Sequence, residues 1–443
     1  MGTNRKDPAT VERVRGGVQC RTPWAGQAGV PLPSYPRVMH DRRFDPNLPL
    51  PPAPKPWVGS EMPTPRPGIP YHLTDMIEAE PALAERVLNR LSGPGPARDL
   101  ALVIRTAASA GRPIIVVGCG TSEHGAVAVA EILRDAHRVL GLPSELGVGG
   151  SPIAVQAFEG GLEPALGRSG AVVIGVSHEG GTQATYRAMS AARDSGSTVA
   201  MITAAAGSPG GVFADITVAT DEMDQSWCHT IGYLSPILAG IAVAGHLTGS
   251  LVAPADARNL MGAALAAGTT AALAGMAERL SGRRHLVMIG SGIDRVAARE
   301  LTLKVEEGAQ IPSAMRDLET MLHGHLAGTG SDTGLVMILA DASARGPRTA
   351  RALGLLRACR ELGITVGLIA STGVAGEIDV DLTPAGRALI PDGAGFDGAA
   401  AALIGTAIPL QRLAEQLAVR RGVNPDAIRR DDPRYLAAMD AAG

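Results

Sequence analysis

Ile114-Ile115-Val116-Val117-Gly118-Cys119-Gly120-Thr121-Ser122 is the stretch that decides the fold. Four consecutive β-branched residues followed by a glycine turn predict a buried strand that ends at the turn. A helix is expected to begin at about Ser122. A strand that passes directly into a helix in this way is typical of a parallel α/β sheet.

The same order of elements recurs along the chain. Further strand-like apolar runs, separated by helical stretches, lie at 172–176, 198–202, 285–289, 335–339 and 364–369. The first two strands begin 58 residues apart (114 to 172), and two strands of the second half begin 50 residues apart (285 to 335). We therefore predict a duplicated, doubly wound α/β unit. The predicted domains are 71–268 and 269–430, followed by a C-terminal tail, 431–443, that completes the site.

Residues 1–70 differ from the rest of the chain, because they hold 15 of the 32 prolines. Such a segment buries little surface and is expected to be extended, either wrapped on the body or disordered. The wrapped arrangement is favoured by four aromatic anchors, Trp24, Tyr35, Phe44 and Trp57.

Composition excludes several classes of function. Forty basic and 43 acidic residues give a net charge of −3, which argues against binding to nucleic acid or to an anionic membrane surface. The chain has no apolar run of membrane-spanning length, no signal-peptide pattern and no closely spaced cysteines. We expect a cytoplasmic protein.

Two loops carry the chemistry of the first half. Gly118–Ser122 places glycines and hydroxyls at the start of a helix, where N–H groups and the helix dipole attract an anion. Ser177–Thr182 follows the next strand in the same way. In a parallel sheet both loops converge on one crevice, which predicts a site for a polyhydroxylated or phosphorylated small molecule. The first loop lacks the third glycine of a dinucleotide-binding pattern, and a plain turn remains the alternative.

These motifs resemble those of the sugar isomerase (SIS) domain family, and among its members the isomerase half of glucosamine-6-phosphate synthase. The first loop reads GCGTS, as in that family, and the second is similar to its SxSGET. The resemblance continues through four more stretches, 76–81, 222–230, 300–307 and 432–436, and through His323-Gly324, which stands 23 residues after Glu300 as in the family's H-G-P.

The resemblance implies two tandem SIS domains, each a five-stranded parallel sheet flanked by helices in a flavodoxin-like αβα sandwich. It also implies a homodimer that interconverts aldose and ketose phosphates without a metal or an organic cofactor. By the resemblance, Glu307 is the base that moves a proton between C1 and C2, Lys304 stabilises the oxyanion, and His323 opens the sugar ring. The residues expected to bind substrate are Gly120, Thr121, Ser122, Ser177, His178, Glu179, Thr182 and Gln225.

Three departures bear on the substrate. Residue 2 is Gly rather than a nucleophilic Cys and only Pro-rich sequence precedes the body, so glutamine-dependent amination is not expected. Ala438 stands where the synthase has its imine-forming lysine. Glu179 replaces a serine that contacts the substrate phosphate, and an ionised carboxylate only accepts hydrogen bonds. We therefore expect a preference for an unphosphorylated or amine-bearing sugar, unless Glu179 turns outward or pairs with a cation.

Other functions stay open at this point. An amino-sugar deaminase or deglycase and a non-catalytic sugar-phosphate sensor share the fold, and the retained Lys304, Glu307 and His323 favour an enzyme. His323-Gly324-His325 has a spacing found in zinc sites, but no further ligand spacing accompanies it, so no metal is expected.

Overall fold

The computed structural model describes residues 44–51, 55, 61–162, 170–393, 395–396 and 398–442. Of the four expected anchors, Phe44 lies in these ranges and packs against the core, whereas Trp24, Tyr35 and Trp57 lie outside the described residues. Leu50 is buried, and its N–H donates to Oε2 of Glu222 at 3.2 Å. Segment 44–51 is therefore wrapped on the folded body.

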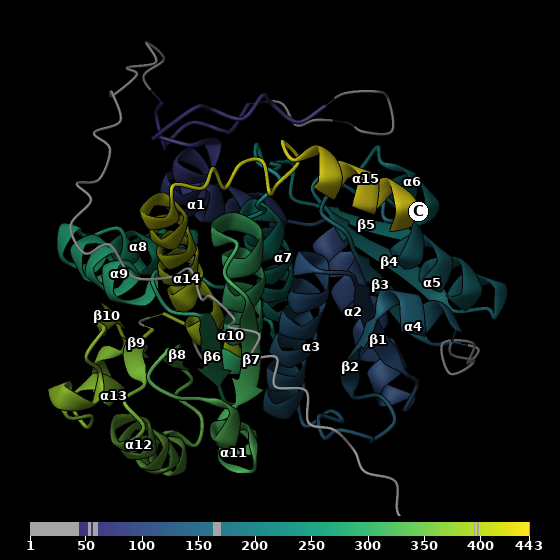
Figure 1. Ribbon diagram of the computed structural model, residues 1–443. Helices are drawn as coiled ribbons and strands as arrows, with labels where there is room; N and C mark the ends of the chain where they lie inside the picture. The colour runs from purple at the N-terminus through teal and green to yellow at the C-terminus, as the bar shows by residue number, and fades with distance from the viewer. Residues whose placement is uncertain are drawn as a thin grey trace, which may run out of the picture. The chain divides into compact units, whose positions relative to one another are not determined.

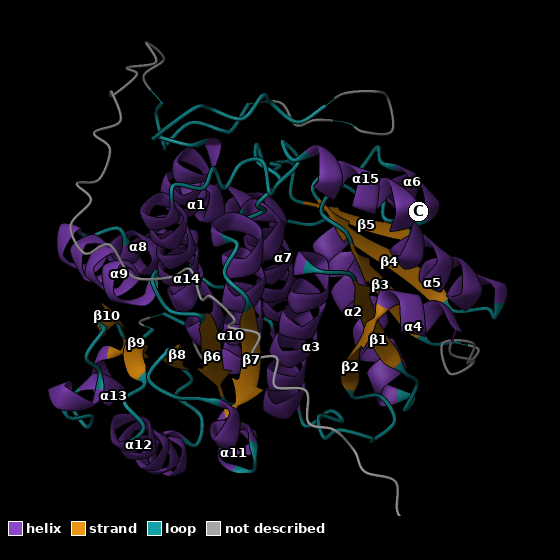
Figure 2. Ribbon diagram, in the orientation of Figure 1, coloured by secondary structure: helices purple, strands orange, loops and turns teal. Residues whose placement is uncertain are grey.

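The first sheet is parallel and five-stranded, with the spatial order β2-β1-β3-β4-β5. Its strands are β1 (Ile114–Gly118), β2 (Pro152–Gln156), β3 (Val172–Val176), β4 (Thr198–Thr203) and β5 (Ile216–Ala219). Every residue of β1 and β3 is buried because helices cover both faces of the sheet, as Figure 2 shows. The strand order reverses between β1 and β3, which makes this pair the topological switch point of the sheet.

The second sheet repeats this plan with the spatial order β10-β9-β8-β6-β7. Its strands are β6 (His285–Gly290), β7 (Ser313–Asp317), β8 (Thr333–Leu339), β9 (Thr365–Ser371) and β10 (Gly386–Ile390). All pairs in both sheets are parallel, so the predicted duplicated α/β architecture is confirmed (Figure 1).

The helices alternate with the strands. Those up to the middle of the chain are α1 (His72–Leu91), α2 (Pro96–Ser109), α3 (Thr121–Leu140), α4 (Ala157–Leu162), α5 (Gln183–Asp194), α6 (Pro209–Phe213), α7 (Ile231–Thr248) and α8 (Pro254–Ala264). The later ones are α9 (Ala267–Leu280), α10 (Asp294–Lys304), the π-helix η3 (Val305–Ala309), α11 (Leu318–Leu322), the 3₁₀ helix η4 (His325–Gly328), α12 (Arg345–Glu361), α13 (Thr372–Ala375), the 3₁₀ helix η5 (Val380–Leu382), α14 (Gly398–Arg421) and α15 (Pro433–Ala442).

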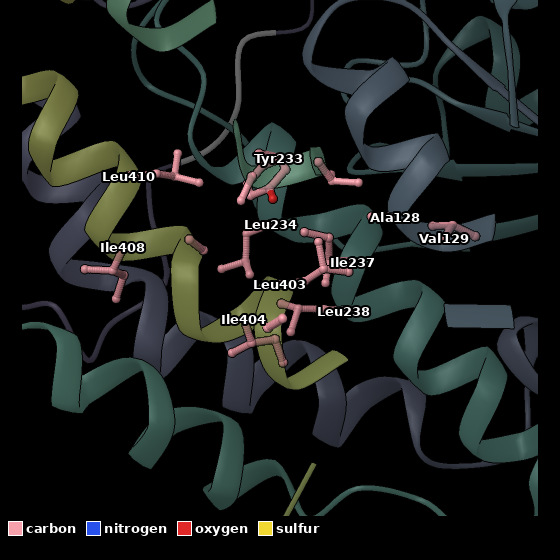
Figure 3. Packing of buried hydrophobic residues seen from close by; sticks show 14 of the residues in the cluster. Ala128, Val129, Tyr233, Leu234, Ile237, Leu238, Leu403, Ile404, Ile408 and Leu410 are labelled. Atoms are coloured by element: carbon pink, nitrogen blue, oxygen red, sulfur yellow. The ribbon is translucent and has the colours of Figure 1, made fainter. Parts of the chain in front are cut away.

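The largest core cluster runs through both halves of the chain. In Figure 3, Leu234 and Leu238 of α7 lie close to Leu403 of α14, and all three side chains are buried. Helix α14 also packs on α8, α9 and α10, so it joins elements of both halves. Helix α7 has the length and mean hydropathy of a membrane span, 18 residues and 1.4, but 83% of it is buried inside the fold. It is therefore a helix of the protein core.

Candidate functional site

The two loops singled out in the sequence lie at the switch point of the first sheet. They follow β1 and β3, which are neighbours in the sheet, so both begin at its carboxyl edge. Gly118 is tightly enclosed, because a Cβ there would lie 2.2 Å from the backbone oxygen of Ser122. Gly120 has φ = 56° and precedes the first residue of α3, Thr121. The first loop needs glycine at both positions to turn directly into the helix.

The second loop is fixed by its own hydroxyls. Oγ of Ser177 lies 2.9 Å from Oγ1 of Thr182 and accepts from the N–H of Gly180 at 3.1 Å. Gly180 has φ = 72°, which closes the turn. Ser177 is buried and Thr182 is exposed, at the residue before α5 begins. The two hydroxyls expected to bind substrate are therefore side by side.

His178 is buried beneath this loop. Its Nε2 accepts from the N–H of Asp224 at 3.0 Å, so Nε2 carries no proton. Burial lowers the pKa of His178 to about 4. The imidazole is therefore neutral, and its approach to Oδ2 of Asp224 at 3.1 Å is no ion pair. The side chain is 3% exposed, so in this arrangement it is a buried structural residue that holds the chain segment at Asp224.

Asp224 organises the segment that faces the second loop. Its Oδ1 accepts from the N–H groups of Thr230 and Ile231, and its Oδ2 accepts from the N–H of Gly232. Burial alone would raise the pKa of Asp224, but these N–H donors hold it below its ordinary value. The ionised carboxylate therefore caps the start of α7.

The side-chain hydrogen bonds of Gln225 within the described residues are made outside the two loops. Its side chain is buried and its Nε2 donates to the carbonyl oxygens of Pro51 and Met223, at 3.3 and 3.4 Å. It thus holds segment 44–51 against the body.

Glu179 is half-buried and lies within electrostatic reach of His229, Asp224 and Arg430. Burial raises its pKa above the ordinary value, whereas His229 and Arg430 act in the opposite direction. Arg430 lies 3.8 Å from the ring centroid of Trp227, and this cation–π contact holds the guanidinium in place. The residues just before it, Ile428 and Arg429, have positive φ angles of 40° and 64°. The C-terminal segment thus brings a cation close to the carboxylate that the sequence analysis singled out.

Lys304 lies between two carboxylates. Its Nζ is 2.5 Å from Oε2 of Glu307 and 3.6 Å from Oε1 of Glu300. Lys304 is 1% exposed and Glu300 fully buried, whereas the Glu307 side chain is 25% exposed. Burial alone would lower the pKa of Lys304, but both carboxylates raise it, so the ammonium keeps its proton. Glu307 lies in the π-helix η3, a local distortion that is frequent at functional sites.

This ion-pair network touches the first loop. Oγ1 of Thr121 lies 3.4 Å from Oε1 of Glu300, and Nδ1 of His124 lies 2.6 Å from its Oε2. The contacts bring the start of α3 and the helix α10 together. Sequence reasoning grouped Lys304 with Glu307 but gave no role to His124 or Glu300, although Glu300 opens the matched stretch 300–307 and each lies one turn from a selected residue.

His323 lies apart from this network within one chain. Glu307 precedes β7, whereas His323 follows it, so the two residues flank opposite ends of the same strand. The His323 side chain is 68% exposed, and its Nε2 lies 2.6 Å from Oε1 of Glu319. One chain therefore does not bring His323 to Lys304 and Glu307.

The corresponding switch point of the second sheet, between β6 and β8, is filled by the chain itself. A Cβ on Gly292 would lie 2.2 Å from Nη2 of Arg348 and 2.4 Å from Oδ2 of Asp341. The same Asp341 oxygen accepts from the N–H of Ile293, directly before α10. A carboxylate of the protein thus stands where a ligand anion would bind, so the candidate site lies at the first sheet.

Several solved structures have a fold similar to that of this chain. The C-terminal domain of glucosamine-fructose-6-phosphate aminotransferase from Francisella tularensis is similar with a TM-score of 0.67 and 18% identity, over 82% of this chain and 99% of that one. Tagatose-6-phosphate ketose/aldose isomerase from Escherichia coli is similar with a TM-score of 0.65 and 16% identity, over 82% of this chain and 97% of that one. Glucosamine-6-phosphate deaminase from Thermotoga maritima is similar with a TM-score of 0.53 and 17% identity, over 78% of this chain and 97% of that one.

No family model and no curated protein sequence matches the chain. The structural likeness, together with the two parallel five-stranded sheets, establishes that the chain has the tandem SIS fold that its motifs predict.

Proposed function

We propose that this protein is a metal-independent aldose–ketose isomerase that acts on a sugar or amino sugar, phosphorylated or not, through an enediol. One observation carries the proposal: a buried ammonium, Lys304, is paired with a partly exposed carboxylate, Glu307, next to the loops of the first switch point. Solved proteins of this fold include a tagatose-6-phosphate ketose/aldose isomerase, which supports the class of reaction.

The proposed chemistry uses the difference in exposure between the two groups. Glu307 is exposed enough to reach a sugar, so it takes the proton from one carbon and returns it to the neighbouring carbon. Lys304 stays protonated and buried, which suits it to stabilise negative charge on the enediol oxygen rather than to form an imine. This agrees with the expectation, drawn from Ala438, that amination through a lysine imine does not occur.

Substrate binding is assigned to the carboxyl edge of the first sheet. The start of α3 after Gly120 presents the positive end of the helix dipole to an anion or hydroxyl, although the N–H groups of Ser122 and Glu123 already donate to the carbonyls of Cys119 and Gly120. The adjacent Ser177 and Thr182 add two hydroxyls. His323 can serve as the ring-opening acid only from a second copy of the chain, so that role depends on the homodimer that we propose for this cytoplasmic protein.

Glu179 and Arg430 are proposed to decide which sugar binds. A carboxylate with a guanidinium nearby suits a ligand with a hydroxyl or ammonium group for Glu179 and a negative group for Arg430. Glu179→Ser is expected to weaken binding of glucosamine and to strengthen binding of fructose 6-phosphate, as measured by calorimetry. Tight fructose 6-phosphate binding by the wild type, unchanged in Glu179→Ser, would show that Arg430 merely neutralises the carboxylate.

The isomerase proposal is tested by hydrogen exchange. Wild-type protein in D₂O is incubated with fructose 6-phosphate, glucosamine 6-phosphate and glucosamine, and deuterium at C1 or C2 is followed by NMR. Glu307→Gln is expected to lose exchange by about 10²-fold or more. The matched control is Glu306→Gln, the exposed neighbour, whose Oε1 accepts from the N–H of Ser313. Equal exchange in the wild type and Glu307→Gln would refute the role of Glu307.

An amino-sugar deaminase is the second candidate. It is favoured by the acidic Glu179 in the substrate loop and by the glucosamine-6-phosphate deaminase among the similar structures. Release of ammonia from glucosamine or glucosamine 6-phosphate, together with formation of a ketose, would decide for deamination. A protein that binds these sugars without exchange or ammonia release would instead be a sensor.

A further inference from the structure

We propose that His124, held by Glu300, is the residue that opens the sugar ring, by moving the proton of the anomeric hydroxyl to the ring oxygen. The inference deepens the proposed isomerase function and rests on it. It assigns to a histidine of the same chain the step that His323 could perform only from a second copy.

The position of His124 suits this role. It is the fourth residue of α3, one turn after the glycine loop that is proposed to bind the sugar. Its side chain is 13% exposed, so it lies at the surface of the site rather than in the core. Its Nε2 is not a buried atom and makes no hydrogen bond within the described ranges, which leaves this nitrogen open to a ligand.

Glu300 fixes the imidazole. The 2.6 Å contact from Nδ1 of His124 to Oε2 of a fully buried carboxylate holds the proton on Nδ1 and leaves a lone pair on Nε2. Burial alone would raise the pKa of Glu300, but Lys304 and His124 hold it below its ordinary value, so the carboxylate is charged. A buried carboxylate that orients a histidine and stabilises its imidazolium form is the arrangement of the hydrolase triads.

The same carboxylate connects His124 to the proposed isomerisation machinery. Its second oxygen, Oε1, lies 3.6 Å from Nζ of Lys304, which in turn contacts Glu307. His124 and Glu307 are thus separated by one carboxylate and one ammonium. Ring opening and proton transfer at C1 and C2 concern neighbouring atoms of a sugar, so this one network would serve both steps.

The step balances without another reagent. Nε2 of His124 takes the proton of the anomeric hydroxyl, and the oxygen's electron pair forms the carbonyl as the bond from the anomeric carbon to the ring oxygen breaks. The ring oxygen, which receives the electrons of that bond, then takes the proton back from Nε2. The imidazole ends as it began, and Glu300 stabilises the imidazolium in between.

The test measures ring opening directly. Interconversion of the α and β anomers requires an open ring but no proton transfer at carbon, and exchange NMR measures its rate for fructose 6-phosphate, glucosamine 6-phosphate and glucosamine. The wild type and Glu307→Gln are expected to accelerate interconversion equally. His124→Asn is expected to lose about 10²-fold of that acceleration.

Matched variants separate catalysis from structure. Arg299 of α10 lies 3.8 Å from Glu123 of α3, so this partly exposed pair joins the same two helices without the imidazole. Arg299→Gln is therefore expected to keep full anomer interconversion, and thermal unfolding monitors the folding of every variant. If His124→Asn is poorly folded, Glu300→Gln, which keeps the size of the side chain but loses the charge, is expected to slow interconversion in the same way.

Several outcomes would overturn the inference. Unchanged interconversion in His124→Asn, loss in His323→Asn instead, or equal loss in Arg299→Gln would each do so. Carbon-bound hydrogen exchange without accelerated interconversion would reject the role of His124 and leave the isomerase proposal standing. Accelerated interconversion together with carbon-bound exchange that is unchanged in Glu307→Gln would reject the role of Glu307 and keep that of His124.

Discussion

Gly118 and Gly290 occupy the same place in the two halves of the chain. Each is the last residue of the first strand in its sheet, β1 or β6. A Cβ on Gly118 would lie 2.2 Å from the backbone oxygen of Ser122, and one on Gly290 would lie 2.4 Å from that of Asp294, four residues further on in both cases. The glycines that follow, Gly120 and Gly292, have φ angles of 56° and 60°. The duplication therefore extends to the backbone of the strand-to-helix turn.

Adding a methyl group to either turn should destabilise the fold. Gly118→Ala and Gly290→Ala each force a backbone shift, because the clash is with main-chain atoms, and we expect a loss of about 2 kcal/mol or more in each. Urea unfolding measures the effect. Gly346→Ala, with nothing within 4 Å of the added Cβ, is the control. Sugar binding should suffer in Gly118→Ala alone, since the second switch point is filled by Asp341 and Arg348.

Removing the buried ammonium should cost more than removing its exposed partner. Lys304→Met leaves Glu300 buried without its cation, which is expected to lower the free energy of unfolding by about 3–5 kcal/mol. Glu307→Gln affects a side chain that is 25% exposed, so we expect a much smaller change. Urea unfolding of the two variants at pH 7 compares them. Equal losses would mean that Lys304 is anchored by Glu307 rather than by Glu300.

His178 should make the protein less stable in mild acid. The pKa of His178 is about 4 in the folded state and ordinarily about 6.5. Between these two pH values the unfolded chain therefore binds a proton at His178 that the folded protein does not bind. Stability is thus fully present above pH 6.5 and falls as the pH drops towards 4. Between pH 7 and pH 5 we expect a loss of about 2 kcal/mol. The loss should be smaller in His178→Asn, measured by urea unfolding, and an identical pH dependence would contradict this assignment.

Glu80 should act in the opposite direction. It is fully buried, and neither side-chain oxygen has a hydrogen-bond partner within the described residues. Burial raises the pKa of Glu80 well above its ordinary value, so the folded protein keeps a proton that the unfolded chain releases. This contribution is fully present below the ordinary pKa of a glutamate and declines as the pH rises.

Glu80→Gln, which imitates the neutral acid, is therefore expected to increase stability at pH 8 more than at pH 5. Thermal unfolding at both pH values checks this. A uniform loss at both would indicate that Glu80 is ionised and paired.

The sequence was informative wherever a local pattern had one structural solution. The run Ile114–Val117 is apolar on both faces, which only a strand covered on both sides explains, and the glycines after it demand the tight turn. Lys304 and Glu307 are three residues apart on a helix, so their contact also follows from local geometry.

Contacts between the halves were not accessible in the same way. The approach of His124 to Glu300 depends on how α3 packs on α10, and no local pattern encodes that packing. For His323 the grouping rests on the resemblance and not on local geometry. Its place in a motif grouped it with Glu307, although a strand predicted between the two would have placed them at opposite edges of the second sheet.

The core that runs through both halves has a consequence for dissecting the molecule. Helix α14, near the end of the chain, fills space beside α7 and α3, and α1 packs on α7, α8 and α14. A fragment that ends after α7 would lack α8 and α14 and would leave their apolar partners exposed to water. Neither repeat is therefore expected to fold on its own when it is expressed separately. A chain cut between α7 and α8 should instead reassemble as two complementary fragments, each insoluble without the other.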